Sequence, residues 1–348
     1  TVFQESISDI PKFIYDEEFV LSKIELSPIV MPLSNQIYSF PALNNEAFKN
    51  LPGLLADSLP DKFGNRLLEK YLAQQGRNIN NLSMVERLLY TGKRAMGALE
   101  YKPEKQYNKT KDSTIDIDSL VKLASEVLTE REKINIKENH PAMEQIIKVG
   151  TSAGGARAKA VIAWNEKTND IRSGQIDGLE GYEYWIMKFD GVSGNEANSK
   201  HGSFTKIEYA RSEERRVGKE VISTMQTENE NLKQELNDKN LANKKLYEEN
   251  NRFHFMTKRF DRLAQGQKLH MQTLGALAHF DYNAVGQYSY EDAASVMYKL
   301  KLGQDEIEQL YRRMVFNVIA RNQDDHVKNI SFLMNQEGAW KLSPAYDM

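Results

Sequence analysis

The sequence contains no cysteine. Disulfide bonds, thiolate nucleophiles and cysteine-based zinc sites are therefore all excluded. Only 9 prolines and 20 glycines occur among the 348 residues, too few for a collagen-like or low-complexity chain. No apolar run approaches the roughly 20 residues that a membrane-spanning helix needs. These absences favour a cytoplasmic protein that has no membrane partner.

An excess of charge of one sign is also lacking. The 46 basic and 49 acidic residues leave a net charge of −3, so no general basic field points to direct nucleic-acid binding. Hydrophobic residues make up 40% of the chain and charged residues 27%, which is ordinary for a globular protein. At roughly 150 residues per domain, the length indicates about two domains.

Neither end of the sequence has the features of a natural terminus. The first ten residues contain no basic stretch followed by an apolar one, so they predict no signal peptide. The chain starts without methionine and stops at Met348, directly after a strand-like run. We therefore expect a fragment that is truncated at its C-terminus.

Hydrophobic periodicity predicts a mixture of helices and strands. Apolar residues recur at helical spacing in 61–72, 83–89, 117–131, 290–302 and 304–320, and Asp61 is placed to cap the first of these helices. Residues 159–164, 183–189 and 252–260 are expected to be strands, and 330–342 a hairpin with its turn at 335–338. The resulting fold class is α+β.

Residues 211–249 differ from their neighbours, because 17 of these 39 residues are charged. Met225, Leu232 and Leu246 fall in one heptad row, which Lys239 interrupts, while asparagine fills most of the partner row. The pattern predicts a solvated charged helix, with a short coiled coil as the alternative. A basic-zipper element is disfavoured because glutamates interleave the arginines and would repel phosphate.

The strongest cluster of functional side chains is Asp-Asp-His-Val-Lys-Asn over 324–329, with Asp347 following 18 residues after Asn329. The intervening hairpin is expected to bring Asn329 and Asp347 together, and their oxygens are suited to Mg²⁺ bound to phosphates. Asp324, five residues before Asn329, is placed to accept a proton from a substrate hydroxyl, as in a kinase catalytic loop. One alternative is an Asp-rich turn that caps and is solvated. His326 is a further candidate for a catalytic base or a metal ligand, against a structural role in which it packs and hydrogen-bonds the loop.

A second cluster is glycine-rich and runs from Gly150 to Lys159. Its glycines allow backbone N–H groups to turn toward an anion, although the spacing is not that of a Walker A motif. Lys188 lies on the predicted strand 183–189, and Glu208 is its natural partner in the lysine–glutamate pair with which kinases hold ATP phosphates. The alternatives are a flexible turn and a lysine that extends from its strand into solvent.

Taken in order along the chain, these motifs resemble the HipA family of toxin kinases of bacterial toxin–antitoxin systems. The resemblance is carried by seven segments, namely 51–61, 92–101, 152–159, 185–189, 259–262, 322–329 and 344–347. It implies an α+β, two-lobed protein-kinase-like fold with an extra N-terminal subdomain. We expect that subdomain over 1–145 and the kinase-like core over 146–348, interrupted by the charged helical segment 211–249.

The resemblance also implies roles for individual residues. Asp324 would be the catalytic aspartate, and Asn329 and Asp347 would hold Mg²⁺. Lys188 would contact ATP, and Ser152 would be the loop serine that such kinases phosphorylate on themselves. The full set of expected nucleotide-binding residues is Ser152, Gly154, Gly155, Lys159, Lys188, Glu208, Phe260 and Asp261, the last two at the hinge beside adenine and ribose.

The implied activity is ATP-dependent, Mg²⁺-dependent phosphorylation of serine or threonine in a protein substrate. The resemblance points to a component of translation, such as an aminoacyl-tRNA synthetase, as the substrate. It points to a helix-turn-helix antitoxin, and through it operator DNA, as the partner. The alternative is an inactive pseudokinase-like fragment that binds nucleotide or protein, because segment 211–246 replaces the ordinary helix that follows Glu208 in the family.

Overall fold

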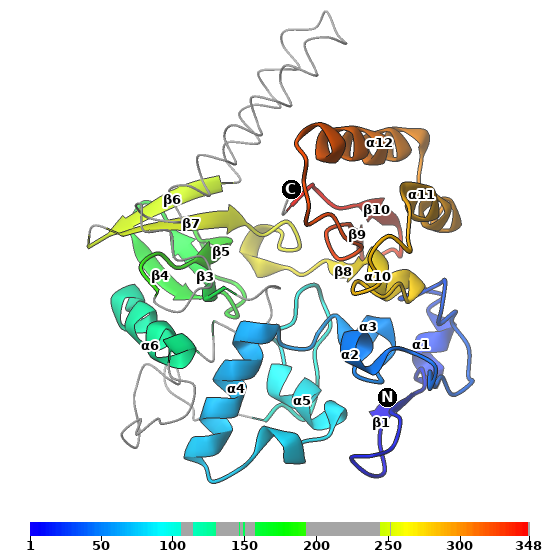
Figure 1. The fold of residues 1–348 in the computed structure, drawn as a ribbon, viewed down its shortest axis with the longest axis horizontal. Coiled ribbons are helices and arrows are strands. Elements are labelled where there is room, and N and C mark those ends of the chain that lie inside the picture. The colour runs from blue at the N-terminus through cyan, green and yellow to red at the C-terminus, as the bar shows by residue number, and fades with distance from the viewer. Residues whose placement is uncertain are drawn as a thin grey trace, which may run out of the picture. The chain divides into compact units, whose positions relative to one another are not determined.

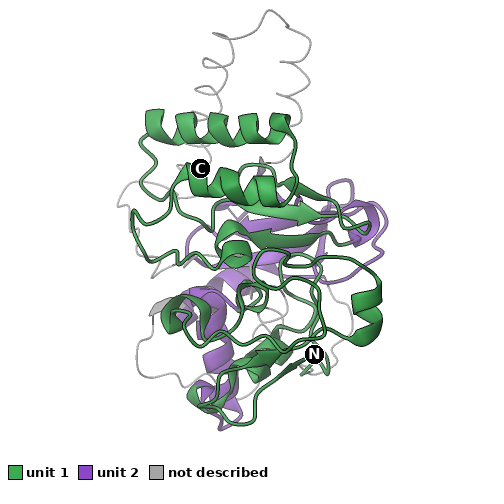
Figure 2. Ribbon diagram, turned by 90° about the vertical axis from the view of Figure 1, so that its right-hand side faces the viewer, with its two compact units in different colours: residues 1–59, 80–105, 268–348 green, residues 60–79, 106–267 purple. Residues whose placement is uncertain are grey.

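The computed structural model describes residues 1–105, 114–129, 146, 149, 157–192, 244–250 and 252–346, and these divide into two compact units (Figures 1 and 2). Unit 1 contains residues 1–59, 80–105 and 268–348, and unit 2 contains residues 60–79 and 106–267. Each unit is therefore built from segments that are distant in the sequence. The short 3₁₀ helix η1 (Ile79–Asn81) lies at one of the points where the chain passes between them.

Unit 2 is built on a five-stranded antiparallel sheet with the order β4-β3-β5-β7-β6. Its strands are β3 (Lys159–Asn165), β4 (Asp170–Ser173), β5 (Glu183–Lys188), β6 (Lys244–Glu249) and β7 (Arg252–Lys258). Every side chain from 159 to 164 is buried, so β3 is covered on both faces. The three strands predicted at 159–164, 183–189 and 252–260 are confirmed.

Two long helices and one short 3₁₀ helix complete unit 2. They are α4 (Lys62–Gln74), α6 (Ile117–Thr129) and η2 (Ala264–Gly266), and α4 packs against α6. The Asp61 carboxylate accepts a hydrogen bond of 2.6 Å from the backbone N–H of Gly64, which confirms the predicted cap. The apolar stripe of α4, including Phe63 and Leu67, is fully buried.

The prediction of a helix through 211–249 is wrong over its last six residues. Residues 244–249 form β6, which pairs in register with β7. Tyr247 is buried there and its ring lies edge-on to Trp164, with 6.0 Å between the ring centroids. The left-handed Asn250 turns the chain into β7. Sheet hydrogen bonds and this aromatic contact outweigh the weak heptad pattern. Residues 211–243 lie outside the described residues, so the rest of the predicted helix stays a prediction.

The N-terminal part of unit 1 consists of short elements around an apolar cluster. They are β1 (Val2–Phe3), which pairs with β2 (Lys12–Phe13), and the helices α1 (Glu17–Leu21), α2 (Asn45–Phe48), α3 (Gly53–Ala56) and α5 (Met84–Thr91). A capping box between Ser83 and Glu86 starts α5, which confirms the helix predicted at 83–89. The cluster includes Met31, Leu51, Leu54 and Leu88.

The C-terminal part of unit 1 contains a three-stranded antiparallel sheet with the order β10-β9-β8. Its elements are β8 (His270–Thr273), α10 (Leu274–Ala278), α11 (Tyr290–Lys299), α12 (Gln304–Ile319), β9 (Ser331–Met334) and β10 (Trp340–Leu342). The predicted hairpin and both predicted helices are confirmed. Helices α11 and α12 lie side by side and share an apolar cluster with the sheet (Figure 1).

No helix in the described part of the chain is long and apolar enough to cross a membrane.

Candidate active site

The loop between α12 and β9 holds the strongest predicted cluster, residues 324–329. Its two ends are tied together, because the Asn329 side-chain amide donates to the Asp324 backbone carbonyl over 2.5 Å. The Asn329 backbone N–H also donates to the His326 carbonyl over 2.8 Å. Asn329 is buried, whereas the side chain of Asp324 is 81% exposed. The loop therefore presents a carboxylate to solvent from a closed backbone turn.

The structure distinguishes the two adjacent aspartates. Asp325 accepts a hydrogen bond of 2.7 Å from the Tyr290 hydroxyl of α11. The Asp324 carboxylate lies near His326, with 3.7 Å between Asp324 Oδ1 and His326 Nε2. The catalytic assignment of Asp324 rests on its spacing to Asn329 and stays a prediction.

The hairpin of β9 and β10 returns the chain toward this loop. The Tyr346 hydroxyl donates to the Lys328 backbone carbonyl over 2.5 Å and is also hydrogen-bonded to Ser331. Asp347, the residue after Tyr346, lies outside the described residues. The pairing of Asn329 with Asp347 therefore stays a prediction.

Asn329 has the chemistry needed for a magnesium ligand. Its amide nitrogen is used in the bond to Asp324, so its oxygen is left as an acceptor, and such an oxygen is a hard ligand. Among the described residues, no group of three or more His, Cys, Asp or Glu side chains is arranged to hold a metal.

The glycine-rich loop falls almost entirely outside the described residues, and so do Ser152, Gly154, Gly155 and Glu208. Lys159, at the end of this segment, starts β3 in unit 2. Its ammonium forms an ion pair of 2.9 Å with Asp61, and the two side chains are only 3% and 8% exposed. Lys159 thus ties the start of β3 to the N-terminus of α4.

Lys188 is the last residue of β5 and lies opposite Lys159 on β3 and Phe255 on β7. It is half-buried, and its ammonium lies 5.7 Å from the centroid of the Phe255 ring. The predicted strand position of Lys188 is confirmed. Its predicted partner Glu208 is outside the described residues, so the Lys188–Glu208 pair stays a prediction.

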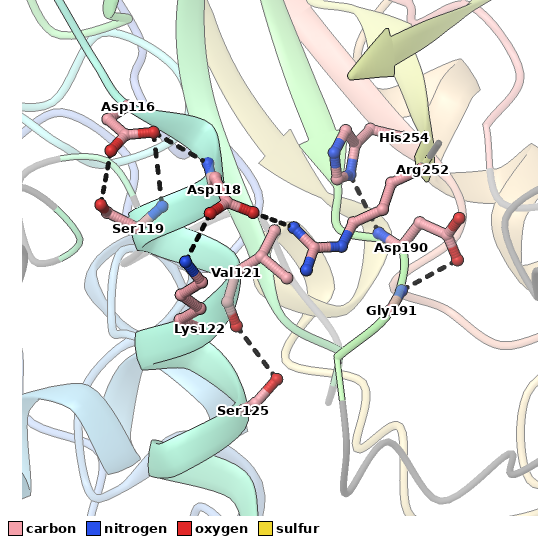
Figure 3. A network of polar contacts seen from close by, with 10 residues as sticks. All are labelled: Asp116, Asp118, Ser119, Val121, Lys122, Ser125, Asp190, Gly191, Arg252 and His254. Carbon is pink, nitrogen blue, oxygen red and sulfur yellow. Dashed lines mark hydrogen bonds and ion pairs between the residues drawn. The ribbon is translucent and has the colours of Figure 1, made fainter. Parts of the chain in front are cut away.

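A polar network in unit 2 holds the backbone that follows Lys188 (Figure 3). The backbone N–H of Asp190 donates to His254 Nδ1 over 3.0 Å, and the Asp190 carboxylate accepts from the Phe253 N–H over 3.0 Å. Arg252 forms an ion pair with Asp118 of α6. Burial lowers the pKa of His254 to about 4, which keeps its Nδ1 free to accept. The segment after β5 is therefore fixed to β7, and β7 is fixed in turn to α6.

Phe260 and Asp261, the expected hinge residues, follow β7. Asp261 is fully buried, and its carboxylate accepts two hydrogen bonds from Arg259, of 2.9 Å and 2.6 Å, and one of 2.8 Å from Arg262. Burial, followed by the nearby charge of Arg259, lowers the pKa of Arg262 to about 10. The carboxylate of Asp261 is thus engaged inside unit 2 and is not presented to solvent.

Sequence reasoning missed several residues that shape the site. Tyr290 and Asn322 bind the 324–329 loop through hydrogen bonds, and Asn317 links these two side chains. Asp61 pairs with Lys159 across 98 positions. Asn317 carried a weak signal, since it is an amide within the otherwise apolar stretch 314–320 of a predicted helix. Asp61 carried a cap signal only.

Comparison with known proteins identifies the family. A model described as "HipA-like C-terminal domain" matches residues 151–348, and one described as "HipA N-terminal domain" matches residues 4–102. The first match alone covers more than half of the chain. The chain therefore belongs to the HipA family.

Among solved structures, the fold is similar to that of a chain in the complex of HipA, HipB and operator DNA from the Shewanella oneidensis MR-1 toxin–antitoxin system. The TM-score is 0.60 at 16% sequence identity, and the alignment covers 100% of this chain and 72% of that chain. At this identity the similarity concerns the fold, and it confirms the α+β, kinase-like class. No curated protein matches the sequence.

Proposed function

We propose that this chain is an ATP-dependent serine/threonine protein kinase of the HipA toxin type. Family membership supports the proposal, because the matched segment 151–348 contains every residue expected to bind nucleotide or metal. The observation that carries it is the 324–329 loop, in which an exposed Asp324 lies five residues before a buried Asn329. That is the arrangement a phosphoryl-transfer loop requires.

The proposed chemistry assigns a task to each residue. Asp324 orients the substrate hydroxyl and accepts its proton, while Asn329 and Asp347 hold Mg²⁺, which neutralises charge on the phosphates. Lys188, supported by Glu208, contacts the phosphates together with the backbone of the loop that contains Ser152, Gly154 and Gly155. Phe260 lies beside the adenine, and the buried Asp261 fixes Arg259 and Arg262 rather than binding the ribose itself.

The proposal extends to partners, location and domain division. We place the protein in the cytoplasm, with a protein of translation as its substrate. A helix-turn-helix antitoxin, and operator DNA through it, would be its partner, and the structural neighbour is from a complex of HipA, HipB and operator DNA. We also propose a division into 1–145 and 146–348, which the two family matches at 4–102 and 151–348 support.

A second candidate function is nucleotide or protein binding without phosphoryl transfer. Two observations favour it, since Lys159 and Asp261, both expected at the nucleotide, are engaged in buried ion pairs within unit 2. Such a pseudokinase would keep the fold and the family motifs. It would bind ATP and leave its γ-phosphate in place.

The deciding experiment is incubation of the chain with γ-labelled ATP and Mg²⁺, followed by phosphoamino-acid analysis of the chain and of added translation proteins. We expect label on serine or threonine that is lost when the metal is chelated. Calorimetric ATP titration of the same protein separates the two candidates. ATP binding without any transfer supports the pseudokinase. Absence of both ATP binding and transfer excludes the kinase and the ATP-binding pseudokinase, and leaves protein binding alone.

A further inference from the structure

A continuous chain of hydrogen bonds joins helices α11 and α12 to the loop that carries Asp324. The Tyr290 hydroxyl donates to Asp325 over 2.7 Å and accepts from the Asn317 amide over 2.9 Å. The Asn317 oxygen accepts from the Asn322 amide over 3.1 Å, and the Asn322 oxygen accepts from the Asp324 backbone N–H over 3.2 Å. The chain therefore begins at one aspartate and ends at the other.

Chemistry fixes the direction of every bond in this chain. An ionised carboxylate only accepts, so the Tyr290 hydroxyl must donate to Asp325. The hydroxyl oxygen then needs a donor, which turns the NH₂ group of Asn317 toward it and the Asn317 oxygen toward Asn322. Asn322 is oriented in turn, so that its oxygen faces the N–H of Asp324. The charge of Asp325 thus orients each amide up to the backbone of Asp324.

Burial makes this chain costly to break. Asn317 is only 7% exposed although it lies near the end of α12. A buried amide without partners is strongly unfavourable, so both of its bonds must be kept. Burial, and then the bond to Asp325, raise the pKa of Tyr290 well above its usual range. The hydroxyl therefore retains its proton at neutral pH and remains a donor.

The backbone carbonyl of Asp324 is held by a second asparagine, Asn329. Its carbonyl accepts from the Asn329 amide over 2.5 Å, while its N–H is held by Asn322. Both peptide groups that flank the Asp324 side chain are thus restrained, although its carboxylate is 81% exposed. Restraint of the backbone leaves only side-chain rotation to place the carboxylate.

We propose that Tyr290, polarised by Asp325 and acting through Asn317 and Asn322, is a positioning residue that fixes Asp324 for phosphoryl transfer. The inference rests on the proposed kinase function for its effect on rate, but not for its effect on the loop. A displacement of about 1 Å at a catalytic group costs on the order of 10²-fold in rate. Loss of this hydrogen-bond chain should therefore lower kcat and leave nucleotide binding largely intact.

The test compares Tyr290→Phe with Tyr298→Phe, which makes the same chemical change on the same helix at a side chain that is 63% exposed. Hydrogen exchange is followed by mass spectrometry in peptides that cover 320–331, with peptides from β8 as an internal reference for folding. Tyr290→Phe should raise exchange over 322–329 by about tenfold or more, in proportion to local opening. Tyr298→Phe should match the unaltered protein.

Phosphoryl transfer is measured on the same variants. Tyr290→Phe should lower kcat by about 10- to 100-fold with KM for ATP changed by no more than about twofold, the pattern of a lost transition-state interaction. Asn322→Ala, which cuts the chain nearer to Asp324, should have a similar effect. Because the two changes break one chain, their combination should be less than additive in both exchange and kcat.

The outcomes separate this inference from the proposed function. If Tyr290→Phe leaves exchange over 322–329 unchanged, or if the two changes are fully additive, Tyr290 does not position Asp324. If the unaltered protein transfers no phosphate, the kinase proposal fails. The exchange measurement then still decides whether the hydrogen-bond chain holds the 324–329 loop.

Discussion

At the scale of single residues, neighbours of the same chemical type are given different tasks by their surroundings. Asp324 and Asp325 are adjacent, but only Asp325 is held by a tyrosine hydroxyl. Lys159 and Lys188 lie opposite each other on β3 and β5, but Lys159 is buried against Asp61 whereas Lys188 is half-buried beside an aromatic ring. The proposed roles of Asp324 and Lys188 therefore depend on burial and hydrogen bonding, and not on residue type alone.

Replacement of the exposed aspartate should abolish transfer. Asp324→Asn removes the proton acceptor and keeps the shape of the side chain, so kcat should fall by about 10²–10⁴-fold with ATP binding retained. Labelled-ATP transfer and calorimetry measure the two effects. Asp305→Asn, an exposed change at the start of α12, is the matched control and should behave like the parent. Equal activity in Asp324→Asn and the control would exclude Asp324 as the catalytic aspartate.

The metal assignment predicts a different pattern. Asn329→Ala and Asp347→Ala should each weaken Mg²⁺-dependent ATP binding by about tenfold or more, because a hydrogen-bond-strength contact to a charged group is worth about 1.5–3 kcal/mol. Both residues act on one ion, so the double variant should lose less than the two single losses combined. Calorimetry with Mg²⁺ and with chelator makes the measurement. Fully additive losses that persist without Mg²⁺ would contradict a shared ion.

At the scale of elements, unit 1 depends on a close contact between two short helices. A Cβ atom added at Gly53 of α3 would lie 2.1 Å from the Ala276 carbonyl oxygen of α10. The Gly53 backbone N–H donates to His279 at the end of α10 over 3.0 Å. The backbones can approach this closely only because residue 53 has no side chain. The glycine at position 53 of the family motif 51–61 is thus explained by packing.

Gly53→Ala should therefore destabilise unit 1, by about 1–3 kcal/mol or more, since the obstructing atom belongs to the backbone. Urea unfolding followed by circular dichroism measures the loss. Gly303→Ala is the control, because no heavy atom lies within 4 Å of the added Cβ. Its only expected cost is the poorer N-cap of α12, about 1 kcal/mol or less. A midpoint for Gly53→Ala equal to that of Gly303→Ala would show that the helices separate without cost.

Elements with local signals were predictable from the sequence, and contacts between distant residues were not. Asp61 and Ser83 both predict the helices that follow them. The spacing of Asp324 and Asn329 is also local and predicts a catalytic loop. The pairing of Lys159 with Asp61 depends on the folded path of 98 intervening positions, which no local pattern encodes. Strand β6 was missed because charge and heptad spacing favour a helix locally, while its pairing with β7 provides the stronger stabilisation.

At the scale of the whole molecule, two buried histidines and the half-buried His279 link stability to pH. Burial lowers the pKa values of His254, His270 and His279 to about 4. In addition, His254 Nδ1 and His279 Nε2 accept backbone hydrogen bonds that a protonated nitrogen could not accept. The unfolded chain takes up protons near pH 6.5, whereas the folded protein does so near pH 4. The contribution of these histidines to the free energy of unfolding is therefore fully present above about pH 6.5 and is lost as the pH falls toward 4.

The free energy of unfolding should fall by up to about 1.4 kcal/mol per pH unit for each histidine in this window. Asp57 opposes the trend, because burial raises its pKa and protonation then favours the folded state. Urea midpoints at several pH values between 7 and 4.5 measure the slope. His279→Gln keeps an acceptor for the Gly53 N–H and removes the titrating imidazole. The free energy of unfolding of this variant should therefore depend less steeply on pH, by the contribution of one histidine. An unchanged slope would contradict the neutral state of His279.

The division of unit 1 among three separate segments has a consequence for its synthesis on the ribosome. Helix α3 and Asp57 emerge early, but their partners Ala276 and Thr273 follow roughly 200 residues later. At about 5–20 residues per second, the early segment waits for roughly 10–40 s before its contacts exist. Unit 2 is fully synthesised within that interval. The nascent chain should therefore acquire its five-stranded sheet first and close unit 1 only afterwards, with α3 open to chaperones until then.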